Sequence, residues 1–208
     1  DTSSAASDVY KRQHPLNVAE VMVVSSNKGS ARIADKLGVK TQQRYIRALG
    51  LLDRINLNIP EAARPLTPQR WKRAELMTIS FGHGLSVSPV HLSAAIATAV
   101  GNGHKITPSL IKGGANSDII EEVFSPETTL KVRAIMRSVI THKRGTGKKA
   151  DAPGYVVGGK TGTAEKHQVG GYSETANIAS FVGSFPLNDP RFVVMVMVDE
   201  PKGQKFSY

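Results

Sequence analysis

The pattern of apolar residues changes once along this chain, after Gly145, and that change constrains the fold more than any other feature. Helix signals dominate before it. After it come three short segments that predict strands, the last two rich in Val, Phe and Met. Helices first and antiparallel strands last predict an α+β fold in which a helical lobe meets a sheet. We therefore expect one domain with a mostly helical lobe at 1–150 and sheet strands at 151–208.

The helical part carries recognisable start and stop signals. Asn17 and Glu20 have the spacing of a capping box, and Ser88-Pro89 and Ser125-Pro126 each place an N-cap residue before a first-turn proline. Glycine follows several of the apolar patterns as a stop signal. Residues 53–75 are proline-rich with little periodicity, which predicts a long surface excursion. The predicted helices cover residues 17–24, 26–37, 42–49, 89–100 and 126–139.

The strand-rich part predicts three strands, at 156–164, 178–185 and 192–198. The cluster from Pro186 to Pro190 has the length and composition of a hairpin turn. Residues 165–175 are polar and glycine-rich, and we expect a loop there, placed to gate a neighbouring site.

Composition excludes several classes of protein. There is no cysteine, so disulfide frameworks and thiolate metal sites are excluded, and no His/Asp/Glu spacing predicts a metal site or a cofactor. No apolar run approaches the roughly 18 residues that cross a bilayer. The net charge of +10 favours anionic partners. With 6% aromatic residues and no nucleic-acid signature, a solvated basic face is expected rather than a nucleic-acid site.

Lys160-Thr161-Gly162-Thr163 lies on a predicted strand and has the composition of a carboxylate-binding wall. An ammonium attracts a carboxylate, and hydroxyl groups hydrogen-bond to it. Glycine lets a substrate backbone lie close against the strand. Three common residues recur by chance, so the motif gains meaning only from its partners.

Ser25-Ser26-Asn27 lies between two predicted helices and supports two interpretations. A serine and an asparagine placed there can present a hydroxyl and a carboxamide at the mouth of a cleft. Alternatively, one of the serines merely caps the helix that follows.

The order of these motifs, Ser25-x-Asn27 and later Lys160-Thr161-Gly162, resembles that of the penicillin-binding transpeptidases. Further similar segments lie at 79–89, 181–186 and 198–201, so the resemblance covers nearly the whole chain. It is strongest to the class B, monofunctional type, and within it to the septal, division-specific enzymes of Gram-negative bacteria. It implies the fold shared by penicillin-binding proteins and serine β-lactamases, with a helical lobe and an antiparallel sheet.

The resemblance also implies a chemistry and a setting. A serine attacks the penultimate D-Ala carbonyl of a peptidoglycan stem peptide, and an amine then takes the acyl group; β-lactams trap the serine ester. Division-machinery membrane proteins are the implied partners, and the periplasmic face of the inner membrane is the implied location. No cofactor is implied.

Roles follow from the resemblance for the residues that match its motifs. Lys160 belongs to the hydrogen-bond network around Ser25, and Asn27 orients the substrate amide. Thr161 and Thr163 face the substrate carboxylate beside Gly162. The backbone N–H of Thr163 supplies half of an oxyanion hole.

The nucleophile motif of that family, Ser-x-x-Lys, has no counterpart upstream of Ser25. Matches at Ser25–Lys28 and Ser109–Lys112 are expected to be coincidences. We therefore expect a fragment, incomplete at both ends and inactive alone. A serine β-lactamase, a penicillin-sensing receptor domain and a nucleic-acid-binding module are the alternatives. Among single residues, Trp71 is expected to anchor the excursion and Glu165 to be a solvent residue at the strand end. For His167, contact with substrate is the minority interpretation, and an ordinary position in the loop after the motif strand is the favoured one.

Overall fold

The computed structural model describes residues 15–112, 121–168 and 171–202, and their side chains apart from those of 165–176. The helices are α2 (Val18–Val23), α3 (Asn27–Leu37), α4 (Val39–Ala48), α5 (Arg73–Ile79), α6 (Pro89–Val100) and α7 (Pro126–Thr141), followed by a short 3₁₀ turn, η1 (Lys148–Ala150). The strands are β1 (Gly158–Gln168), β2 (Gly171–Phe185) and β3 (Phe192–Asp199). The predicted α+β order, helices before strands, is confirmed.

The capping signals in the sequence act as predicted. The Asn17 side chain accepts from the Glu20 N–H, and the Glu20 carboxylate accepts from the Asn17 N–H, both at 2.9 Å. Ser88 and Ser125 cap α6 and α7, each with proline in the first turn. These caps satisfy backbone donors that have no partner inside their helix.

Two helix predictions need correction. α4 begins at Val39 rather than at residue 42, because Gly38, with a φ of 83°, turns the chain directly from α3 into α4. The excursion expected over 53–75 ends earlier, because α5 begins at Arg73. Its start is stabilised by the Glu75 carboxylate, which accepts from the Lys72 N–H at 2.8 Å. A lysine at the N-cap position gives no sequence signal for a helix start.

The sheet has the order β1-β2-β3 and is antiparallel throughout, with Lys160 opposite Val182 and Val182 opposite Met195. The turn between β2 and β3 lies where Pro186 to Pro190 predict it. The prediction of a gating loop over 165–175 is wrong, because β1 runs to Gln168 and β2 starts at Gly171. A register shift between Glu165 and His167 accompanies this extension of the hairpin.

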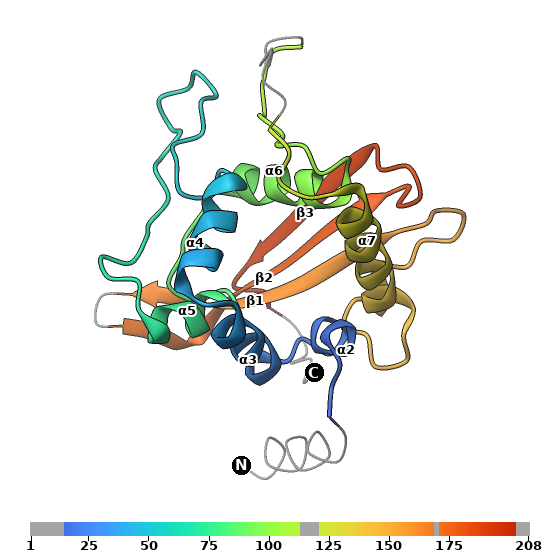
Figure 1. Cartoon of the computed structure of the whole chain (residues 1–208), viewed down its shortest axis with the longest axis horizontal. Coiled ribbons are helices and arrows are strands. Elements are labelled where there is room, and N and C mark those ends of the chain that lie inside the picture. Colours follow the sequence, from blue (N-terminus) through green and yellow to red (C-terminus); the bar gives the residue numbers. More distant parts are fainter. Residues whose placement is uncertain (1–14, 113–120, 169–170, 203–208) are drawn as a thin grey trace.

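Helices α6 and α7 pack on the sheet, α7 mainly on β1 and α6 on β3, while α3, α4 and α5 pack on one another to one side (Figure 1). Helix α2 contacts both α7 and α3, and so joins the two groups. The core between α2, α6, α7 and the sheet is mainly apolar, and its buried apolar residues are Val21, Val23, Ala95, Val100, Met136, Val139, Ile140, Val157, Val182 and Leu187. Burial of this set holds α2 and β1 in fixed positions against α7.

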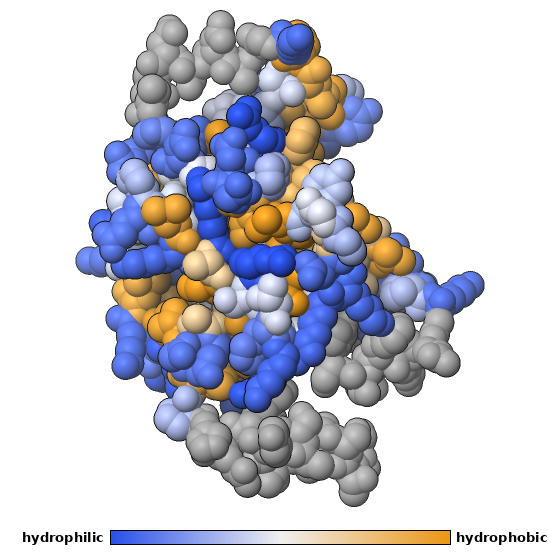
Figure 2. Space-filling model, turned by 90° about the vertical axis from the view of Figure 1, so that its right-hand side faces the viewer, coloured by the Kyte–Doolittle hydropathy of each residue, from blue (hydrophilic) through white to orange (hydrophobic). Residues whose placement is uncertain are grey.

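Figure 2 views the side of the molecule that carries α7 and the loop after it. Hydrophilic residues cover most of this face, around smaller apolar areas.

Candidate active site

Lys160 of β1 joins the two sequence motifs. Its Nζ donates to the hydroxyl of Ser25 at 2.8 Å, although the two residues are 135 positions apart. The same ammonium donates to the backbone carbonyl of Thr161 at 2.7 Å, with the Thr161 hydroxyl at 3.5 Å. The two motifs predicted to share a cleft thus meet through one lysine.

The two interpretations of Ser25-Ser26-Asn27 divide between the two serines. Ser26 caps α3, because its hydroxyl accepts from the Gly29 N–H at 3.1 Å. Ser25 has a φ of 53°, an uncommon left-handed conformation for a non-glycine residue, and its hydroxyl meets Lys160. The backbone around it is fixed by the Ser26 N–H, which donates to the Val21 carbonyl at 2.9 Å. Asn27 begins α3 and is exposed.

Thr146 is a site residue that the sequence reasoning missed. It accepts a hydrogen bond from the Thr161 hydroxyl at 2.8 Å, and its own N–H donates to the Val23 carbonyl at 3.3 Å. It therefore links the end of α2 to β1, beside Ser25. Its signal in the sequence was the pair of flanking glycines, Gly145 and Gly147, to which no motif was assigned.

Those glycines let the loop lie tightly on α7. A Cβ on Gly145 would stand 2.2 Å from the Val139 carbonyl oxygen, and one on Gly147 would stand 2.8 Å from Ile140 Cδ1. Both distances are too short for any larger residue without movement of α7 or the loop. Thr146 is thus held where its hydroxyl meets that of Thr161.

Burial lowers the pKa of Lys160 to about 8 from its ordinary value of 10.5. Within the described part of the chain, no carboxylate forms an ion pair with it. Its charge faces neutral oxygens instead. At neutral pH the site therefore holds a largely protonated ammonium whose positive charge is uncompensated, which suits it to attract a carboxylate.

Gly162 and Thr163 continue along β1 and are exposed. Among the described strands β1 pairs only with β2, so it forms an edge of the sheet. The Ser180 hydroxyl donates to the Gly162 carbonyl at 3.3 Å from the β2 side. Lys160 to Thr163 therefore present an exposed strip beside Ser25.

The structure bears on two further expectations, for Trp71 and Ser109, and leaves those for Glu165 and His167 untested. Trp71 anchors the excursion as predicted: its Nε1 donates to Gln42 Oε1 at 2.9 Å, and Gln42 Nε2 donates to the Leu76 carbonyl at 3.0 Å. The Ser109 hydroxyl closes a local turn, since it donates to the Ile111 carbonyl at 2.8 Å and accepts from the Ile111 N–H at 3.0 Å. The side chains of Glu165 and His167 lie outside the described residues.

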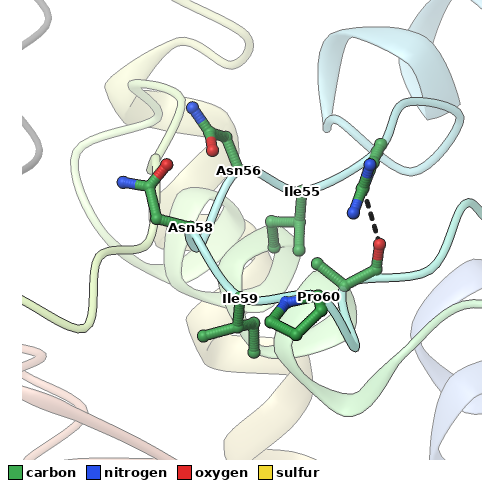
Figure 3. Close-up of a pocket in the computed structure, with 7 residues that line it drawn as sticks. Ile55, Asn56, Asn58, Ile59 and Pro60 are labelled. Carbon is green, nitrogen blue, oxygen red and sulfur yellow. Dashed lines mark hydrogen bonds between the residues drawn. The ribbon is translucent and has the colours of Figure 1, made fainter.

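A pocket of about 420 Å³ lies in the excursion and shares no residue with the Lys160 cluster. Arg54 and Ala62 both line it, and the Arg54 Nε donates to the Ala62 carbonyl at 2.6 Å. Figure 3 shows the Asn56 and Asn58 carboxamides projecting in a similar direction, away from Ile59 and Pro60. The pocket carries no residue assigned to the site by its motifs.

No cluster of three or more potential metal-ligating side chains occurs among the residues with described positions. In the same described ranges, no helix is both long enough and apolar enough to span a membrane.

Comparison with known proteins identifies the class. A family model described as "Penicillin binding protein transpeptidase domain" matches residues 2–208. The chain belongs to this family, and the predicted fold of penicillin-binding transpeptidases is confirmed.

Individual relatives narrow the class to the class B type of FtsI, penicillin-binding protein 3 and PenA. The chain is 36% identical to "Probable peptidoglycan D,D-transpeptidase FtsI" of Caulobacter vibrioides over 97% of its own length and 36% of the relative. It is 34% identical to "Probable peptidoglycan D,D-transpeptidase PenA" of Neisseria meningitidis over 89% of the chain and 32% of that protein.

Solved structures agree with this assignment. The transpeptidase domain of penicillin-binding protein 3 from Burkholderia pseudomallei superimposes with a TM-score of 0.81 at 38% identity, over 89% of this chain and 57% of that one. Penicillin-binding protein 3 from Mycobacterium tuberculosis, complexed with aztreonam, superimposes with a TM-score of 0.82 at 26% identity. The match covers 90% of this chain and 46% of that one. The chain thus spans about a third of the curated relatives and about half of the solved chains.

Proposed function

We propose that this chain is part of a peptidoglycan D,D-transpeptidase that acts in cell division through a serine acyl-enzyme. It supplies two of the three active-site motifs, Ser-x-Asn and Lys-Thr-Gly. The observation that carries the proposal is the 2.8 Å hydrogen bond from Lys160 to Ser25, which joins the Ser-x-Asn and Lys-Thr-Gly motifs. Family membership supports the reaction class, and the contact between Lys160 and Ser25 supports the residue roles proposed below.

In the proposed reaction, a serine oxygen bonds to the penultimate D-Ala carbonyl, the peptide C–N bond breaks, and the terminal D-Ala leaves as an amine. The amine of a second stem peptide then attacks the ester and frees the serine. Lys160 and Ser25 form the path by which a proton reaches the leaving amine. Thr161 and Thr163 bind the terminal carboxylate, with Gly162 between them. Asn27 orients the substrate amide, and the Thr163 N–H stabilises the oxyanion.

The nucleophile in this proposal lies outside the 208 residues. The Ser25–Lys28 match overlaps the Ser-x-Asn motif, and one serine cannot fill both positions. The Ser109 hydroxyl of the other Ser-x-x-Lys match is engaged with its own turn. The chain is then inactive alone. Stem peptides and β-lactams are the proposed ligands, division-machinery membrane proteins the partners, and the periplasmic face of the inner membrane the location.

Covalent labelling with a fluorescent penicillin tests the proposal. We expect no labelling of the 208-residue chain, and stoichiometric labelling of the longer protein that carries it. Lys160→Ala should slow labelling of the longer protein at least 100-fold, since a carboxylate-binding and proton-transferring group is lost. Lys131→Ala, at an exposed lysine of α7, is the matched control and should label normally. Stoichiometric labelling of the 208-residue chain that Ser109→Ala removes would overturn the fragment proposal.

A further inference from the structure

Helices α3 and α4 carry half of the net charge of the chain. Residues 27–48 hold six Lys or Arg and one Asp, which gives +5 of the total +10 within 22 of 208 residues. Five of these cations follow one another at intervals of three or four positions, the spacing that keeps side chains on one face of a helix. All five are exposed. They are here called the basic ridge: Arg32, Lys36, Lys40, Arg44 and Arg47.

The basic ridge lies on the outer faces of both helices. On α3, Arg32 and Lys36 lie opposite Ala34, which is buried. On α4, the three cations lie opposite Gln42, whose buried carboxamide donates to the Leu76 carbonyl of α5 at 3.0 Å. The inner faces of the two helices are thus used for packing within the lobe. The cations are left to solvent or to a partner.

The charges of the ridge are not neutralised within the described parts of the chain. The acidic residue of α3 and α4 is Asp35, and Arg73 of α5 donates to both of its carboxylate oxygens, at 2.7 and 2.9 Å. Among the described residues, no carboxylate forms an ion pair with a ridge cation. Arg44 lies 5.1 Å from the ring centroid of Tyr45, but this contact leaves its positive charge in place.

Exposed aliphatic side chains lie next to the ridge on α3. Ile33 and Leu37 directly follow Arg32 and Lys36 in the sequence and are 39% and 45% exposed. They are four positions apart, so they form a short apolar strip beside the two cations. Cations and aliphatic groups side by side on one exposed helix surface are typical of helices that lie at an anionic membrane surface. An acidic protein must place its carboxylates to match the cations, whereas a lipid surface accepts them without a fixed register.

We propose that the basic ridge docks this lobe on an anionic phospholipid surface. The cations meet lipid phosphates, and Ile33 and Leu37 rest among the headgroups. The ridge shares no residue with the Lys160–Ser25 pair. The inference therefore adds a binding surface to the proposed function and does not depend on the transpeptidase reaction.

Co-sedimentation of the 208-residue chain with lipid vesicles tests the inference. One set of vesicles contains about 30% phosphatidylglycerol in phosphatidylcholine, and the other contains phosphatidylcholine alone. At about 50 mM salt we expect the chain to bind the anionic vesicles about tenfold more tightly, or more, than the neutral ones. Salt at about 500 mM should remove most of this binding, because it screens exposed charges. Equal binding to both sets of vesicles would overturn the inference.

The ridge variant is Lys40→Gln/Arg47→Gln, which removes two charges from exposed side chains. Each cation near an anionic surface contributes roughly fivefold to partitioning, so binding to anionic vesicles should weaken about 10- to 30-fold. The matched control, Lys143→Gln/Arg144→Gln, removes the same charge from exposed residues after α7, across the molecule from α4 in Figure 1. It should bind within about threefold of the unchanged chain. Equal losses in the two variants would mean that overall charge is responsible and that the inference is wrong.

Two further measurements separate a lipid from an acidic protein as the partner. Ile33→Ser/Leu37→Ser keeps every charge and should weaken binding to anionic vesicles by about three- to tenfold. Its circular dichroism should be unchanged, because both side chains are already exposed. Unchanged vesicle binding by this variant would show that α3 does not meet the lipid. Binding of poly-glutamate through the ridge, without binding of anionic vesicles, would assign the ridge to an acidic protein and overturn the inference.

The same proteins separate this inference from the proposed function. Lys160→Ala should bind anionic vesicles within about twofold of the unchanged chain, because its half-buried ammonium lies outside the ridge. The ridge variant of the longer protein should be labelled by fluorescent penicillin at the normal rate. Absence of labelling in the unchanged longer protein contradicts the proposed function alone. Vesicle binding that the ridge variant retains contradicts this inference alone.

Discussion

The ammonium of Lys160 lies 2.8 Å from the hydroxyl of Ser25, and no acidic side chain pairs with it in the described ranges. The lysine is a half-buried cation supported by a serine hydroxyl and a backbone carbonyl. Such a cation is costly to hold in a fold and is suited to meet an incoming anion. Its titration and its cost to stability are therefore the most direct consequences of the structure.

Lys160 should titrate near pH 8, well below the ordinary lysine pKa of 10.5, because burial disfavours its charged form. Its protonated fraction then falls from about 90% at pH 7 to about 10% at pH 9. Affinity for a D-Ala-D-Ala peptide should fall about tenfold over the same interval. NMR of the lysine Cε groups measures the pKa, with Lys160→Ala identifying the resonance. A midpoint above 10 would show that the ammonium is not desolvated.

Replacement of Lys160 by methionine should stabilise the chain at pH 7 by about 1–3 kcal/mol, since it removes a buried charge. The sign follows from the lowered folded pKa: the penalty is fully present below pH 8 and fades as pH rises to 10.5, where unfolded lysine also loses its proton. The advantage of Lys160→Met should thus be smaller at pH 10 than at pH 7. Urea unfolding at both pH values measures it, with Lys131→Met as the exposed control.

The sequence predicted much of this fold because its signals were local. Ser88-Pro89, Ser125-Pro126 and the Asn17 box each act within one turn of helix, and each is confirmed. Helix α5 was missed because its start is stabilised by Glu75 and not by the N-cap side chain. The hairpin at 165–175 was missed because strand pairing is a non-local property that can override polar, glycine-rich composition.

The candidate site likewise combines residues that sequence motifs indicated with one that only the tertiary structure reveals. Lys160 and Ser25 were expected together through a motif order, whereas their contact depends on packing of α2 and β1 against α7. Thr146 had no motif, and its role appears only when the loop after α7 is placed between Val23 and Thr161. Partners of this kind are fixed by tertiary structure and leave little trace in spacing.

Thr146 and Thr161 should be energetically coupled through their 2.8 Å hydrogen bond. Each single change to valine leaves one hydroxyl of the half-buried pair without its partner and should cost about 0.5–1.5 kcal/mol of unfolding free energy. The double variant should cost less than the sum, by about 1 kcal/mol. Urea unfolding of the four proteins completes the cycle. Simple additivity would mean that the two hydroxyls do not interact in solution.

Gly147 should not tolerate alanine, because the added Cβ would stand 2.8 Å from Ile140 Cδ1 and 3.2 Å from Val139 Cγ1 in the core. We expect Gly147→Ala to destabilise the chain by about 1–3 kcal/mol through overpacking. Ala150→Gly, at the partly exposed end of η1, changes backbone freedom without adding volume and should cost less than about 1 kcal/mol. A change of less than 0.5 kcal/mol for Gly147→Ala would show that the loop is not held against α7.

Ser25 combines a functional hydroxyl with a left-handed backbone, and two substitutions separate the contributions. Ser25→Ala removes the hydroxyl and keeps the φ of 53°, whereas Ser25→Gly removes the hydroxyl and also relieves the backbone. The glycine variant should therefore be about 1 kcal/mol more stable than the alanine variant, the reverse of their order at an ordinary position. Both should lose the bond to Lys160 and weaken D-Ala-D-Ala peptide binding alike. Urea unfolding gives the stability difference and NMR titration the binding; an alanine variant as stable as the glycine one would place Ser25 in relaxed backbone geometry.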